Sequence, residues 1–229
     1  MNLAIILAAG RSRRLKGINK IFYSIKGKPL IFYTISIFEK HPQIKKIIII
    51  IRKSDFKKFS NLIKKYRFKK IVALVKGGKT RQESAFNGLR EAEKSGAKSG
   101  DIILFHNGCN PLVPRGEIFE IIKATKKDKA AVLAQPARDT IKKADRNKFV
   151  EKTIPRESIY LAQTPQAMEF NLAKRAFEKA FTDNFRGTDD VMLAERLGKK
   201  AKIVATSSKN IKITYPEDLD FIKNFLKQL

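Results

Sequence analysis

The sequence is poor in cysteine and lacks long apolar runs. Its single cysteine, Cys109, cannot form an internal disulfide and is typical of a protein of the reducing cytoplasm. No apolar run reaches the roughly 18 residues that a membrane-spanning helix needs, so we expect no membrane span. The opening MNLAIILAAGRSRR is apolar first and basic second, the reverse of an export signal. We therefore expect a cytoplasmic protein with no membrane partner.

Acidic residues are also scarce. Asp and Glu number 22 against 49 Lys and Arg, which gives a formal net charge of +27. Such a charge favours anionic partners, namely nucleotides, phosphorylated metabolites or nucleic acid. The basic residues are mostly lysines spread along the whole chain, without an aromatic-interleaved patch. Solvated faces explain this pattern better than a nucleic-acid footprint, so we expect no specific nucleic acid as a partner.

The hydrophobic pattern predicts one α/β domain over residues 1–229. A length of 229 residues with 43% hydrophobic content is enough for one sizeable core. The run KIIIII has no polar alternation, as in a strand buried on both faces. Strands are predicted at 3–7, 46–51, 71–75, 102–105, 130–135 and 201–205. Helices are predicted at 29–39, 54–66, 81–93, 114–125, 171–180, 188–197 and from 216 onward. This alternation predicts a Rossmann-like, mainly parallel sheet flanked by helices.

Acidic residues at the starts of two predicted helices suggest helix caps. Asp55, with Ser54, precedes the helix predicted at 54–66, and Asp189 and Asp190 open the one predicted at 188–197. Short side-chain oxygens at these places can accept from free backbone N–H groups. Asp189 and Asp190 could alternatively stand near a metal ion, and we favour the capping interpretation.

The segment 138–158 breaks the alternation of strands and helices. It reads RDTIKKADRNKFVEKTIPRES, with two short β-like pieces on either side of a polar turn at 145–148. This pattern predicts a hairpin arm that projects from the core. A projecting arm in a small α/β protein often packs on a partner subunit, so we expect a homodimer formed through the arm.

Four loops are expected at the carboxyl ends of the strands, where parallel sheets bind ligands. They are AAGRSRRLKGINK, KGGKTRQES, HNGCNP and QPARDT, all rich in small or cationic residues. The first loop matches neither G-x-G-x-x-G nor the P-loop pattern, so neither of those phosphate-binding motifs is present. Its cations, Arg11, Arg13, Arg14, Lys16 and Lys20, are either a solvated basic surface or a clamp for a triphosphate. Phosphoryl transfer needs such cations where negative charge builds up.

Seven segments carry a family resemblance. LAAGRSRRLKGINK is similar to the L-x-x-G-x-x-x-R-M…P-K signature of sugar-nucleotide-type nucleotidyltransferases. GKPLIFYTISIF, GGKTRQESAFNGL, ARDTIKK, LAQTPQAM, GTDDVMLAERLG and NIKITYPEDL follow in the family's order. Together they resemble the 2-C-methyl-D-erythritol 4-phosphate cytidylyltransferase family across nearly the whole chain. Asn19 stands where the signature has proline, and the preceding linker is one residue shorter.

The resemblance implies transfer of CMP from CTP to 2-C-methyl-D-erythritol 4-phosphate, with release of pyrophosphate, in the non-mevalonate route to isoprenoid precursors. It implies Mg²⁺ as a cofactor, bound mainly through the CTP phosphates; direct metal ligands are not predicted. The alternatives are a cytidylyltransferase for another polyol phosphate, such as ribitol 5-phosphate, and a non-catalytic paralogue that binds nucleotide. A nucleic-acid-binding protein is a further alternative that rests on charge alone.

The resemblance also assigns roles to individual residues. The predicted catalytic residues, which stabilise the transition state or position the substrate phosphate, are Arg14, Lys20, Arg156 and Lys212. The predicted nucleotide-binding residues are Ala8, Ala9, Gly10, Gly78, Arg81 and Ser84. Predicted polar contacts to substrate are Asn107, Asn110, Thr140 and Thr164. In the family the arm is exchanged between subunits, which implies that Thr140 and Arg156 serve the partner's site.

The loop HNGCNP departs most from the family, which usually has H-D-A-A-R-P there. Asn107 replaces the aspartate and Asn110 the arginine, while His106 is kept. Cys109 falls at an alanine position, which favours a packed small residue over a Cys/His nucleophile. Two amides can still exchange hydrogen bonds with hydroxyls. These departures leave cytidylyl transfer as the reaction that the resemblance implies, but they leave the identity of the polyol phosphate open.

Overall fold

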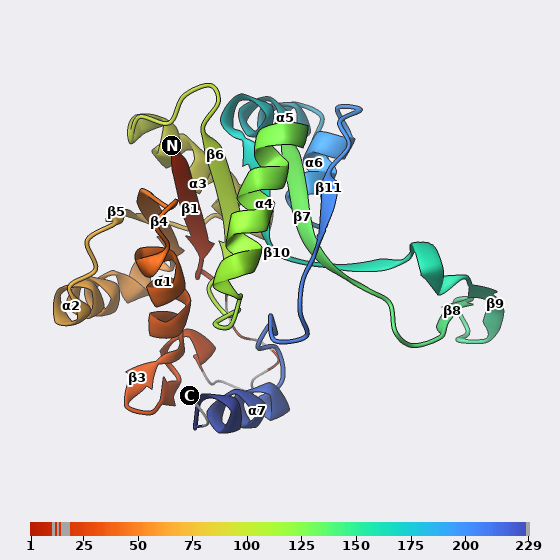
Figure 1. The fold of residues 1–229 in the computed structure, drawn as a ribbon, viewed down its shortest axis with the longest axis horizontal. Coiled ribbons are helices and arrows are strands. Elements are labelled where there is room, and N and C mark those ends of the chain that lie inside the picture. Colours follow the sequence, from red (N-terminus) through yellow and green to blue (C-terminus); the bar gives the residue numbers. More distant parts are fainter. Residues whose placement is uncertain (11, 13, 15–18, 228–229) are drawn as a thin grey trace.

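The computed structural model describes residues 1–10, 12, 14 and 19–227. Its core is a seven-stranded sheet in the order β11-β7-β10-β6-β1-β4-β5 (Figure 1). All neighbouring strands are parallel except where β10 pairs with β6 and β7. The strands are β1 (Asn2–Leu7), β4 (Lys46–Ile51), β5 (Ile71–Lys76), β6 (Ile102–Asn107), β7 (Ala130–Pro136), β10 (Tyr160–Glu169) and β11 (Lys202–Ala205).

Helices cover both faces of the sheet, as the sequence predicts. Alternate residues of β4 enter opposite apolar clusters: Ile47 and Ile49 lie in one, Ile48 and Ile50 in the other. This two-sided burial explains why the strand has no polar alternation. The first cluster includes residues of α1 (Leu30–Lys40), α2 (Phe56–Tyr66), α4 (Arg115–Asp128) and α7 (Pro216–Lys227); the second includes residues of α3 (Arg81–Lys94), α5 (Phe170–Thr182) and α6 (Val191–Glu195).

The remaining described elements are short. A two-stranded ribbon joins β2 (Ser24–Ile25) to β3 (Lys28–Pro29), and single 3-10 turns lie at Lys20–Phe22, Lys53–Asp55 and Arg156–Ser158. Among the described helices, none combines the length and the apolar character required to cross a membrane.

The strand β10 was not predicted from the sequence. It lies between β6 and β7 and pairs antiparallel with both. Its sequence, YLAQTPQAME, contains Pro165, which cannot donate to a sheet ladder. The register with β7 shifts between Ala162 and Gln166, so the proline lies where the ladder is already interrupted. The fourth and fifth predicted strands are therefore not neighbours.

The helix cap predicted for Asp55 is wrong. Asp55 is the residue before α2, but its side chain accepts no hydrogen bond from the helix backbone. The carboxylate instead accepts from Arg52 Nε at 2.7 Å and Nη2 at 3.2 Å. A charged donor three residues earlier competes successfully with the weaker backbone donors.

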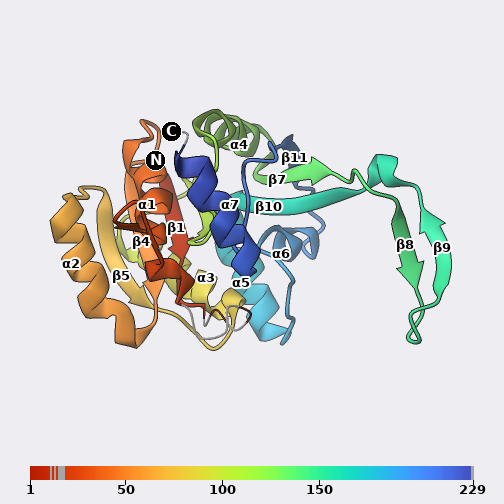
Figure 2. The same ribbon diagram turned by 90° about the horizontal axis from the view of Figure 1, so that it is seen from below.

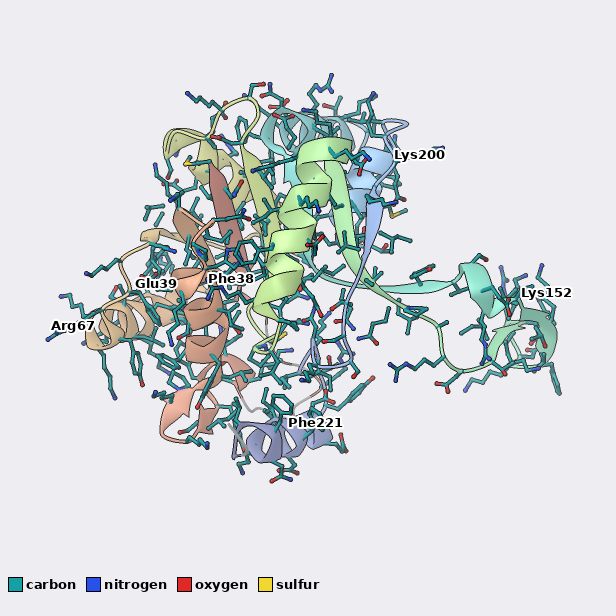
Figure 3. The ribbon with its side chains drawn as sticks, viewed as in Figure 1. Phe38, Glu39, Arg67, Lys152, Lys200 and Phe221 are labelled. Atoms are coloured by element: carbon teal, nitrogen blue, oxygen red, sulfur yellow. The ribbon has the colours of Figure 1, made fainter. Side chains whose placement is uncertain are left out.

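The arm projects from the body as the sequence predicts (Figures 1 and 2). It contains β8 (Ile141–Ala144) and β9 (Val150–Ile154), which pair with each other in a separate sheet. Figure 3 shows Lys152 on the arm, far to one side of Phe38 in the body. Apolar side chains at its tip are bare, since Phe149 is 73% and Val150 61% exposed. A two-stranded hairpin with so little apolar burial is at best marginally stable by itself.

Candidate active site

A cleft of about 700 Å³ opens at the carboxyl ends of the parallel strands. Residues from three of the four predicted loops meet there, and the segment after β11 adds two more. Most of the predicted nucleotide-binding and catalytic residues are therefore brought together. The lining residues are Leu7, Ala8, Ala9, Gly10, Ser12, Arg14, Lys20, Ile21, Gly78, Lys79, Thr80, Arg81, Ser84, Asn107, Cys109, Lys212 and Thr214.

The floor of the cleft is backbone, held at the end of β1. The Ala8 N–H donates to the Ile50 carbonyl at 2.7 Å, and the Gly108 N–H donates to the Leu7 carbonyl at 2.8 Å. A Cβ on Gly108 would lie 3.1 Å from the Ala8 Cβ and 3.0 Å from Ile31 Cδ1. Glycine at this position allows the close approach, because a Cβ would require Ala8 or Ile31 to shift. The close approach leaves the turn of Ala8, Ala9 and Gly10 in the cleft lining.

The N-terminus of α3 forms one wall. Thr80 caps the helix by accepting from the Glu83 N–H at 3.0 Å, and the Ser84 hydroxyl accepts from the Gly78 N–H at 3.1 Å while donating to the Thr80 carbonyl at 2.8 Å. A Cβ on Gly78 would lie 2.3 Å from the Glu83 Cβ. The helix directs its positive end toward the cleft, a favourable position for phosphate oxygens.

Arg81, the first residue of α3, is held by an ion pair. Its guanidinium donates to both carboxylate oxygens of Asp190, at 2.8 and 2.6 Å. Burial opposes its charged form, but the Asp190 carboxylate outweighs burial and raises the pKa of Arg81 above its ordinary value. Gln166 supports the pair, because its Oε1 accepts from the Asp190 N–H at 2.8 Å. Arg81 is thus fixed in place before any ligand binds.

The two acids at the start of α6 differ in role. Asp189 caps the helix as predicted, since its Oδ1 accepts from the Met192 N–H at 3.0 Å. The cap predicted for Asp190 is wrong, because its side chain makes no capping hydrogen bond. The partner of Asp190 is Arg81, which lies 109 residues away. A charged, bidentate donor makes the stronger bond.

Three predicted catalytic cations line the cleft. Lys20 Nζ donates to the Ile213 carbonyl at 2.8 Å, and the Arg14 guanidinium lies 5.3 Å from the centre of the Tyr215 ring. Lys212 is exposed as a residue, but desolvation of its ammonium group in the cleft lowers its pKa, and the positive charges of Arg81, Lys20 and Arg14 lower it further. Such crowding of like charges is relieved when an anion binds. Arg11, Arg13 and Lys16 lie outside the described residues.

The HNGCNP loop separates its residues between the cleft and the core. Asn107 and Cys109 line the cleft, although Cys109 is only 6% exposed. Asn110 is 1% exposed and does not line the cleft, so the structure places it beneath the site. His106 is fully buried, and burial lowers its pKa to about 4. Its Nε2 donates to the Asn110 carbonyl at 2.9 Å, which is a structural bond.

The remaining predicted site residues, Thr140, Arg156 and Thr164, do not line the cleft. Thr164 is buried, 4% exposed, and its hydroxyl accepts from the Asn107 N–H at 3.3 Å. Thr140 and Arg156 are exposed and belong to the arm, outside the cleft lining of their own chain. The guanidinium of Arg156 donates to the carbonyl of Arg138.

Seven residues that line the cleft were not among the predicted site residues: Leu7, Ser12, Ile21, Lys79, Thr80, Cys109 and Thr214. All except Ile21 lie inside the predicted motifs and loops, so the motifs indicated the right segments but not every position within them. Within the described part of the chain, no three His, Cys, Asp or Glu side chains come together as a metal site would require. The donors offered to a ligand are mainly backbone N–H groups and cations, which suits a phosphorylated molecule.

A Rossmann-like sheet with a cationic, backbone-lined cleft at its carboxyl edge is an arrangement that suits a nucleotidyltransferase. The sequence model of one family, IspD, 2-C-methyl-D-erythritol 4-phosphate cytidylyltransferase, matches residues 2–228. The chain belongs to this family and is an enzyme of the cytidylyltransferase class.

Individual relatives agree with this assignment. The 2-C-methyl-D-erythritol 4-phosphate cytidylyltransferase of Caldanaerobacter subterraneus is 41% identical over 98% of each chain. The enzyme of that name from Bacillus velezensis is 39% identical over 98% of this chain and 95% of its own. The crystal structure of 4-diphosphocytidyl-2C-methyl-D-erythritol synthase from Anaerococcus prevotii superposes with a TM-score of 0.87 at 31% identity, covering 99% of this chain and 96% of that one. These names favour methylerythritol phosphate over ribitol 5-phosphate as the second substrate.

Proposed function

We propose that the chain transfers the cytidylyl group of CTP to 2-C-methyl-D-erythritol 4-phosphate. A phosphate oxygen of the second substrate attacks the α-phosphorus of CTP, and the bond from that phosphorus to the β-phosphate bridging oxygen breaks. The products are 4-diphosphocytidyl-2-C-methyl-D-erythritol and pyrophosphate. Family membership supports the pair of substrates. The observation that carries the mechanism is the convergence of three predicted catalytic cations, Arg14, Lys20 and Lys212, on one backbone-lined cleft.

Charge stabilisation is the main task of the site. Phosphoryl transfer asks for little covalent chemistry from the protein and for cations placed where charge accumulates. Arg14 and Lys20 stabilise the transition state, and Lys212 holds the substrate phosphate beside them. The hydrogen bond from Lys20 to the Ile213 carbonyl supports this pairing, because Ile213 directly follows Lys212 in the segment between β11 and α7. In-line geometry is thereby prepared in advance.

Nucleotide binding falls to the floor of the cleft and to the wall formed by the start of α3. The turn of Ala8, Ala9 and Gly10 encloses the phosphates, and the N-terminus of α3 adds a positive dipole. Gly78, Arg81 and Ser84 line the cytidine pocket. Arg81 is fixed by Asp190, which supports a rigid reading of the base. Bases with the wrong edge leave polar groups unpaired and are rejected.

Mg²⁺ is expected to enter with CTP, bound mainly through its phosphates. The described part of the cleft fits such an ion, since it offers cations to the phosphates and does not gather acidic side chains into a cage. When bound, the ion neutralises phosphate charge in the transition state. The protein's own residues orient the two phosphorylated substrates around it.

The arm is the expected means of dimerisation. Its bare apolar tip, and the position of Thr140 and Arg156 outside the cleft lining of their own chain, support a homodimer in which these two residues serve the partner's site. We place this enzyme in the cytoplasm, in agreement with its single, unpaired cysteine.

A substrate panel tests the proposed reaction. Pyrophosphate release is measured with CTP, ATP, GTP and UTP against methylerythritol, ribitol and glycerol phosphates. Release that requires both CTP and methylerythritol phosphate is the expected result. Faster release with ribitol 5-phosphate would contradict the second substrate. Nucleotide binding without release from any pair would contradict catalysis and identify a binding protein.

A further inference from the structure

Three asparagine side chains form a chain of hydrogen bonds beneath the cleft. Asn107 Nδ2 donates to Asn110 Oδ1 at 3.3 Å, and Asn110 Nδ2 donates to Asn210 Oδ1 at 3.3 Å. Asn110 is 1% exposed and Asn210 is fully buried, so water does not compete with these bonds. Only Asn107, at one end, reaches the cleft. We call these three residues the amide relay.

The far end of the amide relay fixes its direction. Asn210 Nδ2 donates to the Thr164 backbone carbonyl at 2.8 Å. A carbonyl oxygen can only accept, so the NH₂ group of Asn210 must face Thr164 and its Oδ1 must face Asn110. The NH₂ group of Asn110 then turns toward Asn210, which leaves its Oδ1 toward Asn107. Each amide sets the orientation of the next.

At the cleft end, the amide relay determines which way the side-chain amide of Asn107 faces. One N–H of its NH₂ group donates to Asn110, and no described residue donates to its Oδ1. The backbone of the loop is held as well, because the Asn110 N–H donates to the Asn107 carbonyl at 3.1 Å and His106 Nε2 donates to the Asn110 carbonyl at 2.9 Å. Asn107 is therefore prepared as an acceptor.

We propose that the amide relay presents Asn107 Oδ1 as an acceptor for a hydroxyl group of the polyol phosphate. Asn107 contacts the substrate, whereas Asn110 and Asn210 are positioning residues that act through it. This inference rests on the proposed function for the identity of the substrate. It reassigns Asn110 from a substrate contact to a support of the contact. The site then selects a second substrate that carries a hydroxyl donor at this place.

Two variants of Asn110 test the relay against a purely structural role. Asn110→Leu keeps the approximate volume but removes both polar groups, which frees the Asn107 amide to turn over. Asn110→Asp has the shape of asparagine, and its site is 1% exposed, so desolvation favours the protonated acid; its O–H then donates to Asn210 Oδ1 while its other oxygen accepts from Asn107 and preserves the orientation of that amide. We expect Asn110→Leu to raise the KM for methylerythritol phosphate about tenfold, the worth of one hydrogen bond, with the KM for CTP within about twofold. Asn110→Asp should stay within about threefold of the wild type.

Two kinetic results would overturn the inference. One is an equal KM for methylerythritol phosphate in the two variants, and the other is a rise in the KM for CTP as large as the rise for methylerythritol phosphate. A double variant, Asn107→Leu with Asn110→Leu, should be no worse than Asn107→Leu alone, because the two residues act through one contact. Additive losses in that double variant assign Asn110 a separate role and refute the relay.

A measurement on the substrate-free wild-type protein separates this inference from the proposed function. NMR follows solvent exchange of the Asn107 side-chain NH₂ protons, with those of exposed Asn147 as an internal reference. The relay predicts slower exchange at Asn107, retained in Asn110→Asp and lost in Asn110→Leu. Exchange as fast as that of Asn147 in the wild type overturns the relay even if Asn110→Leu fails to fold. Absence of turnover with intact protection refutes only the proposed function.

Discussion

Acid should destabilise this protein through a histidine directly beneath the active-site loop. His106 is fully buried and neutral, and burial lowers its pKa from 6.5 to about 4, with the positive charge of Arg81 acting in the same direction. The unfolded chain takes up the proton near pH 6.5, whereas the folded chain resists it until about pH 4. Between these values the unfolded state binds more protons, so the free energy of unfolding falls as the pH falls.

The size of this effect follows from the pKa difference. A difference of about 2.5 units at 1.36 kcal/mol per unit gives about 3 kcal/mol over the whole window, most of it reached by about pH 4.5. The full contribution is present above pH 6.5, and no further loss comes from this residue below pH 4. A loss of this size is a large part of the stability of an ordinary domain.

Urea unfolding at pH 7 and pH 4.5 provides the assay, with His106→Gln as the reference protein. Glutamine does not titrate, and its amide nitrogen can still donate to the Asn110 carbonyl. The difference in unfolding free energy between the two proteins should change by about 2–3 kcal/mol between the two pH values, to the disadvantage of the wild type. His41→Gln is measured for comparison. Burial lowers the pKa of His41 as well, so its difference should change in the same direction. An unchanged difference for His106→Gln would refute the reasoning.

Three further predictions concern the cleft and the arm. Lys20→Ala and Lys212→Ala should each slow pyrophosphate release at least about a hundredfold while the melting temperature stays near that of the wild type. Near-normal release from either would contradict its role. An equimolar mixture of Lys212→Ala and Arg156→Ala subunits should regain about one quarter of wild-type activity after exchange, because half of the dimers are mixed and each has one intact site of two. No recovery would exclude a shared site. Gly78→Ala should lower the free energy of unfolding by about 1–3 kcal/mol, since its Cβ would meet Glu83, and an unchanged value in urea unfolding would show that the loop adjusts.

Local pattern accounts for the parts of the fold that the sequence predicted well. The KIIIII strand is observed at Lys46–Ile51 as predicted, because burial on both faces leaves an unambiguous apolar run. The hairpin arm was also predicted, since a polar turn between two β-like pieces is a local signal. By contrast, β10 contains Pro165 and few β-branched residues, and its strand conformation comes from pairing with β6 and β7. Such long-range pairing leaves no local signature.

In the site, too, residues with a local sequence signal could be predicted, whereas contacts between distant residues could not. Arg14, Lys20 and Lys212 could be predicted because motifs mark them, and the structure brings them to one cleft. The Arg81–Asp190 pair joins residues 109 positions apart, and nothing in the local sequence indicates it. The burial of Asn110 was missed for the same reason, because its partner Asn210 lies 100 residues away. Roles that depend on distant partners appear only after folding.

The strand β10 gives the molecule a continuous mechanical connection. It leaves the arm at Tyr160 and runs into the middle of the sheet (Figure 2). There Gln166 accepts from the backbone of Asp190, the partner of Arg81, and Thr164 accepts from the backbone of Asn107. A force or restraint applied to the arm is therefore carried along one covalent strand to the positions behind the catalytic cleft. Hydrogen-exchange protection of β10 amides should rise with protein concentration, so that assembly and the stiffness of the cleft increase together.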